Sequence, residues 1–348
     1  MMYRNVVIDV FAYALPPERI SSAAIEQRLA AVYDRLHLPA GRLELMTGIR
    51  ERRFWPPGTA PSRGAVLAGR EAMRRSSVAA REIGCLINCS VCRDFLEPAT
   101  ATVVHRELGL PDGALVFDIS NACLGILTGM VVLAGMIETG RVRAGMLVAG
   151  ENSRSLVEST IRTMLEDTGL TRRSIKPFFA SLTIGSGAVA VVMCHRDLAP
   201  AGHRLIGEAS LSATEYNHLC RGNADKGMSD SGRTLMSTDS EALMLAGVET
   251  AERTWREFSA ETGLTGADWD CICTHQVGTA HKRLLFERLA LDLSRDFSNL
   301  AEMGNVGSVS CPLAVAMAEE AGRLRPGNRL GMLGIGSGIN CTMLGVEW

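Results

Sequence analysis

The chain repeats itself once, and this duplication constrains the fold more than any other feature of the sequence. VLAGREAMRR at 66–75 resembles MLAGVETAER at 244–253, and their Leu-Ala-Gly triplets start at positions 67 and 245. GRVRAGMLVAG, which starts at position 140, resembles GRLRPGNRLGMLGIG, which starts at position 322. Because two pairs recur in the same order at nearly the same offset, the sequence predicts two copies of a unit of roughly 180 residues.

Each copy alternates helical segments with short apolar strands such as ALVFDI, GMLVAG, GAVAVVM and RLGMLGIG. Continuous apolar runs of this kind are typical of strands that are buried on both faces, with helices covering the sheets. The sequence therefore predicts a layered, duplicated α/β fold with an N-terminal half at 1–198 and a C-terminal half at 199–348. Arginine, proline and other polar residues at 50–64 and 216–233 predict two long surface loops.

Composition excludes several classes of protein. The chain has 348 residues, 47% of them hydrophobic, and can bury a large core. A net charge of −2 leaves no basic surplus for a nucleic-acid backbone. The longest apolar stretch, 124–137, is shorter than a bilayer span, so we expect no membrane insertion. The amino terminus lacks the pattern of a secretory signal, which favours a cytoplasmic location.

The ten cysteines do not predict a disulfide framework, because such frameworks belong to small secreted proteins. Cys89 and Cys92 form an isolated C-x-x-C, and Cys271 and Cys273 form a C-x-C. Both lie in apolar surroundings, whereas zinc needs four converging ligands. We expect buried thiols and no metal site.

Cys123 is the one cysteine whose position suggests chemistry. It follows the strand ALVFDI and precedes a long apolar helix that ends at Gly140. The N–H groups at a helix amino terminus favour a thiolate, which is the nucleophilic form of cysteine. From position alone, a small buried core thiol is an equally good interpretation.

Two further residues are candidates for the same site as Cys123. Asn305 precedes Gly322 by the same spacing as Cys123 precedes Gly140, so pseudo-symmetry predicts that Asn305 occupies the equivalent helix start. His275 ends the strand CICTHQV, where its side chain can leave the sheet. Together the three residues predict a thiol-based site for acyl transfer.

Gly334, Gly336 and Gly338 resemble a dinucleotide-binding loop, but an apolar strand follows them, and no helix amino terminus is available for a pyrophosphate. Glycines here suit a close approach of backbone N–H groups to a developing oxyanion. The oxyanion donors that we predict are the backbone groups of Cys123, Gly336, Ser337 and Gly338.

Glu97, in the run DFLEPAT, lies before Pro98, which favours an extended conformation for the glutamate. The pattern alone does not decide between a solvated loop charge and a carboxylate held for a purpose.

Six motifs, TGIRERRF, NACLG, GSGAVAVV, THQV, GNVGS and GIGSG, resemble the ketoacyl synthase III branch of the thiolase superfamily, in that family's order and across almost the whole chain. LINCSVCRDFLEPATATVV, SATEYNHLCRGN and GIGSGINCTM resemble the subgroup that condenses acyl-CoA substrates in bacterial olefin synthesis. The resemblance implies five α/β/α/β/α layers, a homodimer or a heterodimer with a paralogue, and a catalytic triad of Cys123, His275 and Asn305.

The resemblance also gives Glu97 a role. Synthases that use malonyl thioesters carry a phenylalanine at this position and obtain their carbanion by losing carbon dioxide, so they need no base. The acyl-CoA-condensing subgroup has a glutamate there, which implies that Glu97 removes an α-proton in the neighbouring subunit. In several related synthases a tryptophan and an arginine just before TGIR bind coenzyme A, whereas the corresponding stretch here is GRLELM, so these contacts cannot be carried over. We therefore predict no particular coenzyme A contact, and no cofactor besides the coenzyme A of the substrate.

The leading hypothesis is a condensation of two fatty acyl-CoA molecules through an acyl-cysteine, giving a 2-alkyl-3-ketoacyl product without decarboxylation. Three alternatives stay open: a decarboxylating synthase that uses malonyl-ACP, a non-catalytic acyl-binding subunit of a heterodimer, and a thiol-redox or zinc protein. The apolar helix after Cys123 and some of the methionines are candidates for lining alkyl channels, although core packing is the simpler interpretation for each.

Overall fold

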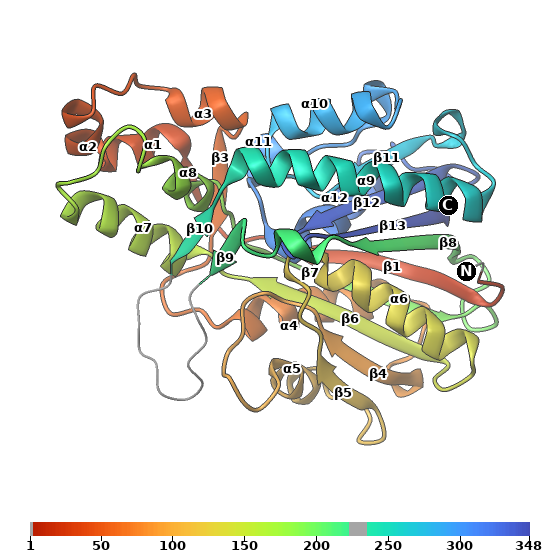
Figure 1. Cartoon of the computed structure of the whole chain (residues 1–348). Coiled ribbons are helices and arrows are strands. Elements are labelled where there is room, and N and C mark those ends of the chain that lie inside the picture. Colours follow the sequence, from red (N-terminus) through yellow and green to blue (C-terminus); the bar gives the residue numbers. More distant parts are fainter. Residues whose placement is uncertain (1–2, 223–234) are drawn as a thin grey trace.

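The structure, a computed structural model, describes residues 3–222 and 235–348 (Figure 1). Its centre is a nine-stranded sheet in the order β11-β12-β13-β8-β1-β7-β6-β4-β5. The strands of the first half are β1 (Val6–Ala14), β4 (Ile83–Asn88), β5 (Leu115–Asp118), β6 (Ala144–Glu151) and β7 (Gly187–His195). Those of the second half are β8 (His203–Ser212), β11 (Cys271–Thr274), β12 (Arg329–Gly336) and β13 (Asn340–Glu347).

The pairing of the strands confirms the duplication. In the first half, β4 and β6 are parallel, while β6–β7 and β7–β1 are antiparallel. The second half repeats the scheme, with β11 and β12 parallel and with β12–β13 and β13–β8 antiparallel. The two halves join where β1 meets β8, through only two paired positions. The predicted boundary at residue 198 falls in the connection between β7 and β8, and it stays a prediction because one sheet runs through both halves.

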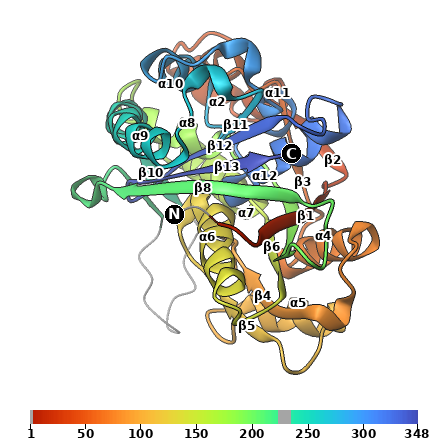
Figure 2. The ribbon, with the colours of Figure 1, turned by 90° about the vertical axis from the view of Figure 1, so that its right-hand side faces the viewer.

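Helices cover these strands in the five predicted layers. α4 (Pro61–Arg75) and α5 (Thr100–Leu108) pack on the outer face of the first half, and α9 (Ser240–Thr262) and α10 (Thr279–Arg288) pack on that of the second. Figure 2 shows the two pairs on opposite sides of the molecule. α6 (Gly125–Glu138) and α12 (Ser310–Glu320) lie between them, in a core cluster that takes residues from both halves. Both central helices are apolar almost all round, as burial on every side requires.

A helical cap lies at one end of the sheet, at the left in Figure 1. It consists of α1 (Ser22–Arg28), α2 (Ala30–Arg35), α3 (Arg42–Thr47), α7 (Arg154–Glu166) and α8 (Lys176–Leu182), which share a hydrophobic cluster. The small antiparallel sheet of β2 (Glu18–Ser21) and β3 (Glu51–Phe54) joins the cap to the large sheet, and α11 (Leu300–Met303) packs beside β3. Among the described helices, none is long and apolar enough to cross a bilayer.

The prediction of a surface loop at 50–64 was wrong. This segment contains β3 and the start of α4, and Arg52 is fully buried. The guanidinium of Arg52 donates to Ser22 Oγ at 3.1 Å and to the carbonyl of Ile20 at 3.3 Å, and burial lowers its pKa to about 10. The sequence of an arginine-rich segment does not show which arginine side chain is buried. The loop predicted at 216–233 contains β9 (Cys220–Gly222), which pairs with β10 (Met236–Thr238), and its remainder lies outside the described residues.

Candidate active site

A cavity of about 1790 Å³ opens between the cap and the ends of strands from both halves. This volume exceeds the 300–1,000 Å³ that is usual for small-molecule sites, so the cavity can accept a large or an extended ligand. Five residues that the sequence singled out line it: Cys123, His275, Asn305, Gly336 and Ser337. Gly338 and Glu97 do not line it.

Cys123 lies in a single 3-10 turn, Ala122–Leu124, between β5 and α6. The turn packs tightly: a Cβ at Gly336, the last residue of β12, would lie 3.0 Å from Leu124 Cγ and 3.6 Å from the backbone N of Cys123. The backbone of the glycine run therefore passes directly beside the N–H of Cys123. This proximity gives the geometric basis for an oxyanion site built from both halves.

The thiol of Cys123 is not activated at rest. Burial raises its pKa to about 12, and the Cys220 thiol and the Glu151 carboxylate act in the same direction. The expectation of a thiolate stabilised by a helix amino terminus was therefore wrong, because desolvation outweighs the helix dipole here. For Cys123 to act as a nucleophile, a base has to take its proton as the sulfur attacks.

A pH titration checks this assignment. Because the Cys123 pKa is raised, the thiolate fraction stays small up to about pH 10 and grows tenfold with each pH unit below that. We expect the alkylation rate of Cys123 by iodoacetamide, followed by peptide mass spectrometry, to climb without a plateau from pH 7 to pH 10. A curve that bends near pH 8.5 and levels off towards pH 10, as for a free thiol, would contradict a Cys123 thiol with a raised pKa.

His275 directly follows β11 and is 4% exposed. Its backbone N–H donates to the carbonyl of Leu333 at 2.9 Å, which fixes the residue at the strand end. Burial, assisted by the neighbouring His281, lowers the pKa of the imidazole to about 3, so the ring is neutral at physiological pH. Its Nδ1 is buried and has no hydrogen-bond partner among the described residues. A neutral imidazole with an unpaired nitrogen can accept the thiol proton or bind a ligand.

Backbone hydrogen bonds fix the position of Asn305. Its N–H donates to the carbonyl of Thr183 at 3.0 Å, and its carbonyl accepts from the N–H of Gly185 at 2.8 Å. Its side-chain Oδ1 accepts from the N–H of Gly307 at 3.0 Å, which leaves the amide NH₂ as a donor for the cavity. The predicted equivalence to Cys123 needs correction, because the matching 3-10 turn is Gly307–Val309 and its central residue is Ser308.

Glu97 lies on the surface, in the loop between β4 and α5. Three apolar side chains of the same loop are about half exposed: Val91 at 52%, Phe95 at 53% and Leu96 at 47%. Val91 and Arg93 reach the cavity wall from the start of the loop, whereas Glu97 does not reach it in the single chain.

Sequence reasoning missed several residues of the cavity. Glu151, His281 and Cys220 line it, as do the cations Arg173 and Lys176, and Cys92 is a third thiol in the wall beside Cys123 and Cys220. The signal for Glu151 was a charged residue at the end of the buried strand GMLVAGE. Met46, Met236 and Met244 line the cavity, whereas no residue of α6 does, and the role of methionines in lining alkyl channels stays a prediction.

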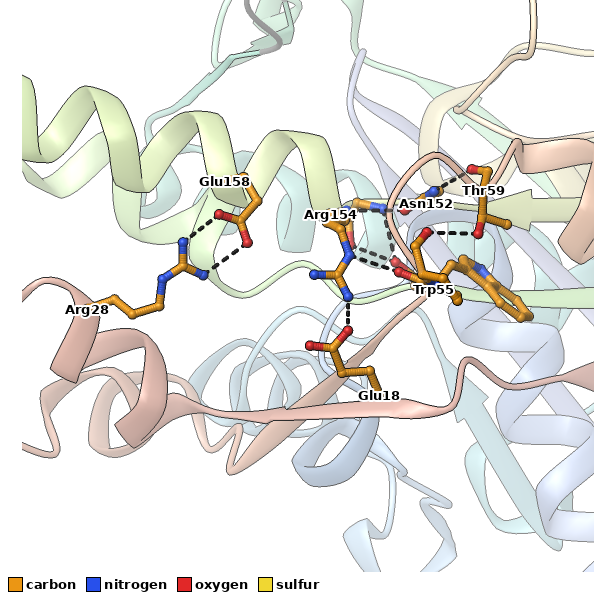
Figure 3. A network of polar contacts seen from close by, with 10 residues as sticks. Glu18, Arg28, Trp55, Thr59, Asn152, Arg154 and Glu158 are labelled. Carbon is orange, nitrogen blue, oxygen red and sulfur yellow. Dashed lines mark hydrogen bonds and ion pairs between the residues drawn. The ribbon is translucent and has the colours of Figure 1, made fainter.

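A polar network anchors α7 at the edge of the cavity (Figure 3). Arg154 pairs with Glu18 and donates from Nε to the carbonyl of Trp55 at 2.8 Å. One turn further along, Glu158 forms a bidentate pair with Arg28 of α1. These contacts connect the cap to the β2–β3 sheet and fix the part of the cavity wall that α7 supplies.

Comparisons with known proteins identify a family and two relatives that the chain resembles. Residues 117–210 match the family model of 3-oxoacyl-[acyl-carrier-protein] synthase III, and residues 259–348 match that of its C-terminal part. The chain is 39% identical over 351 residues to the acyl-CoA:acyl-CoA alkyltransferase of Shewanella oneidensis. It is 35% identical over 348 residues to that of Xanthomonas campestris, and each comparison covers 100% of both proteins.

Crystal structures of OleA from Xanthomonas campestris have the same fold as the chain. A Cys-to-Ala variant and a cerulenin-bound form both give a TM-score of 0.94 at 35% identity, covering 100% of this chain and 98% of theirs. A Cys-to-Ser variant with bound lauric acid and lauroyl-CoA gives 0.93, covering 99% and 100%.

Proposed function

The chain belongs to the acyl-CoA:acyl-CoA alkyltransferases of the 3-oxoacyl-[acyl-carrier-protein] synthase III family, and from that premise we propose that it condenses two fatty acyl-CoA molecules without decarboxylation. The observation that carries the proposal is the large cavity whose wall includes a neutral cysteine, a neutral histidine and an asparagine whose amide is oriented by a backbone hydrogen bond. Its size matches two alkyl chains and a thioester better than one small substrate.

The first step is acylation. Cys123 Sγ attacks the thioester carbonyl of one acyl-CoA while His275 accepts its proton. The N–H of Cys123 and one from Gly336–Gly338 stabilise the tetrahedral oxyanion. The intermediate collapses by breaking the bond to coenzyme A sulfur, which takes up the proton and leaves as free thiol. Cys123 is then a thioester of the first acyl chain.

The second step forms the carbon–carbon bond. A second acyl-CoA places its thioester oxygen towards His275 and the Asn305 amide, which stabilise the enolate. Glu97 of the partner subunit removes the α-proton. The resulting carbanion attacks the Cys123 thioester carbonyl, and the cysteine sulfur leaves and takes up a proton while Glu97 gives one up, so that the thiol and the base are both restored. The product is a 2-alkyl-3-ketoacyl-CoA or, after hydrolysis, the β-keto acid. No cofactor enters this scheme beyond the coenzyme A of the substrates.

The proposed dimer would bring Glu97 to the other cavity. β5 is the edge strand of the sheet, and its four residues, Leu115, Val116, Phe117 and Asp118, are all partly exposed in the single chain. An apolar edge strand exposes unpaired backbone groups that a second copy can cover. The exposed Val91, Phe95 and Leu96 supply apolar contacts near Glu97 for the same interface.

Arg173 and Lys176 suit the phosphates of coenzyme A. Both line the cavity, both are exposed, and neither forms an ion pair with a described carboxylate. We expect the double variant Arg173→Ala/Lys176→Ala to raise the KM for acyl-CoA about tenfold with little change in kcat, because charge-assisted contacts to phosphate hold the ground state and the transition state alike.

Arg253→Ala is the matched control for this double variant, since Arg253 is exposed on α9 away from the cavity. Its kinetics should equal those of the wild type at every ionic strength. An unchanged KM in the double variant would remove Arg173 and Lys176 from substrate binding.

The test of the function is a comparison of donors. Purified protein receives a long-chain acyl-CoA alone, or acyl-CoA with malonyl-ACP, and the release of free coenzyme A thiol is followed with time. We expect sustained release with acyl-CoA alone and no stimulation by malonyl-ACP. Release that depends on malonyl-ACP would instead indicate the decarboxylating synthase, and no release under either condition would indicate a non-catalytic subunit.

A further inference from the structure

Glu151 is a buried carboxylate that the mechanism above leaves without a role. It ends β6, lines the cavity and is 4% exposed. No ion pair neutralises it among the described residues. A buried charge of this kind persists only where hydrogen bonds replace its hydration. The groups that donate these hydrogen bonds therefore indicate which segments the carboxylate holds in place.

Three donors satisfy the carboxylate. Oε1 accepts from the backbone N–H of Val91 at 2.9 Å and from Ser308 Oγ at 2.6 Å, and Oε2 accepts from the N–H of Cys92 at 3.1 Å. Gly307 packs against the same group, because a Cβ there would lie 3.3 Å from Oε1. The carboxylate thus fills the space between two loops that belong to different halves of the duplicated fold.

Each of these loops leads to a residue of the proposed second step. Val91 and Cys92 begin the loop that carries Glu97. Ser308 lies in the turn that follows Asn305, and the N–H of Gly307 in that turn orients the Asn305 amide. One carboxylate therefore contacts both the loop of the base and the turn of the enolate donor.

We propose that Glu151 is a positioning residue that couples the Glu97 loop to the Asn305 turn and so prepares the site for the condensation step. The roles of Glu97 and Asn305 rest on the proposed function, whereas the coupling itself rests on the three hydrogen bonds. Glu151 touches neither the sulfur nor the acyl groups in this assignment. Its negative charge also helps to keep the Cys123 thiol protonated, together with burial and the Cys220 thiol.

Glu151→Gln tests the proposal in the full-length protein. An amide of the same shape can still accept from Val91 and Ser308 through one oxygen, but it turns an NH₂ group towards the N–H of Cys92 and removes the charge that strengthens the remaining hydrogen bonds, so both loops are held less firmly. We expect acyl-enzyme formation, measured by intact mass, to stay within tenfold of wild type. Condensation should fall at least a hundredfold, since Glu97 and Asn305 act only in that step.

Two further readouts separate positioning from a general loss of structure. Hydrogen exchange at the amides of Val91 and Cys92 should become faster, and the pH profile of Cys123 alkylation should move to lower pH because a nearby negative charge is gone. Equal losses in acylation and condensation, or unchanged hydrogen exchange at Val91 and Cys92, would overturn the proposal.

Ser308→Ala keeps the carboxylate and removes one donor. It should slow condensation less than Glu151→Gln does and leave exchange at Val91 and Cys92 unchanged, because the contacts to that loop remain. Faster exchange there would show that the two loops are not linked as proposed. If the wild type itself condenses nothing, the proposed function fails, while the exchange and alkylation results still decide whether Glu151 holds the two loops.

Discussion

Replacing Cys123 with alanine will abolish both acyl-enzyme formation and condensation, with a loss of at least about 10⁴-fold in turnover, because Cys123 is the proposed carrier of the thioester intermediate. Intact mass spectrometry after incubation with acyl-CoA should show no acyl adduct, whereas the wild type should gain the mass of one acyl chain. The variant should still fold, since the substitution removes only a sulfur atom that faces the cavity.

Cys220→Ala is the matched control for this variant. Cys220 lines the same cavity, and its Sγ lies 3.4 Å from Thr238 Oγ1, but it has no part in the proposed chemistry. We expect its turnover to stay within a few-fold of wild type. An acyl adduct on Cys123→Ala would assign the nucleophile to another thiol of the cavity, Cys92 or Cys220, and loss of the adduct in Cys220→Ala with Cys123 intact would assign it to Cys220.

Replacing Glu97 with glutamine will separate the two steps. The α-proton of an ordinary thioester is weakly acidic, and loss of a positioned general base typically lowers the rate by about 10² to 10⁴-fold. We expect acylation of Cys123 to proceed at the wild-type rate and condensation to fall within that range. Retained condensation would exclude Glu97 as the base and return it to the role of a loop charge.

Mixed dimers test whether Glu97 acts across the interface. When Cys123→Ala chains are mixed with Glu97→Gln chains, each mixed dimer should contain one site with both an intact cysteine and an intact partner glutamate. Condensation should therefore reappear to about a quarter of the wild-type level if the subunits exchange at random. No recovery in demonstrably mixed dimers would place Glu97 in its own subunit, and a chain that stays monomeric alone would favour a paralogous partner.

Much of the fold follows from local pattern. The repeats at 66–75 and 244–253 lie in α4 and α9, and those that start at 140 and 322 lead into β6 and β12. Apolar runs that were long enough for buried strands became strands of the central sheet. His275 lies one residue beyond β11, where a side chain leaves the sheet, because strand ends are well marked by a change from apolar to polar residues.

The rest depended on contacts that no local pattern contains. Arg52 is buried because the β2–β3 sheet packs against the cap, and the residues beside Arg52 in the sequence gave no sign of its burial. The resting state of Cys123 follows from enclosure by protein, which outweighs its place before a helix. Glu151 gains its significance only where loops from both halves converge. Pseudo-symmetry likewise placed Asn305 near the correct turn, although the true counterpart of Cys123 is Ser308.

The mass of the product tests the central claim most directly. Wild-type protein receives a single acyl-CoA labelled with ¹³C at its carbonyl carbon, and the condensed product is measured by mass spectrometry before any further step. If two acyl-CoA molecules condense without decarboxylation, the product has the mass of two acyl-CoA molecules less one coenzyme A and retains both labelled carbonyl carbons. A product that forms only with a malonyl donor and carries one labelled carbonyl carbon, extended by two unlabelled carbons, would contradict that claim.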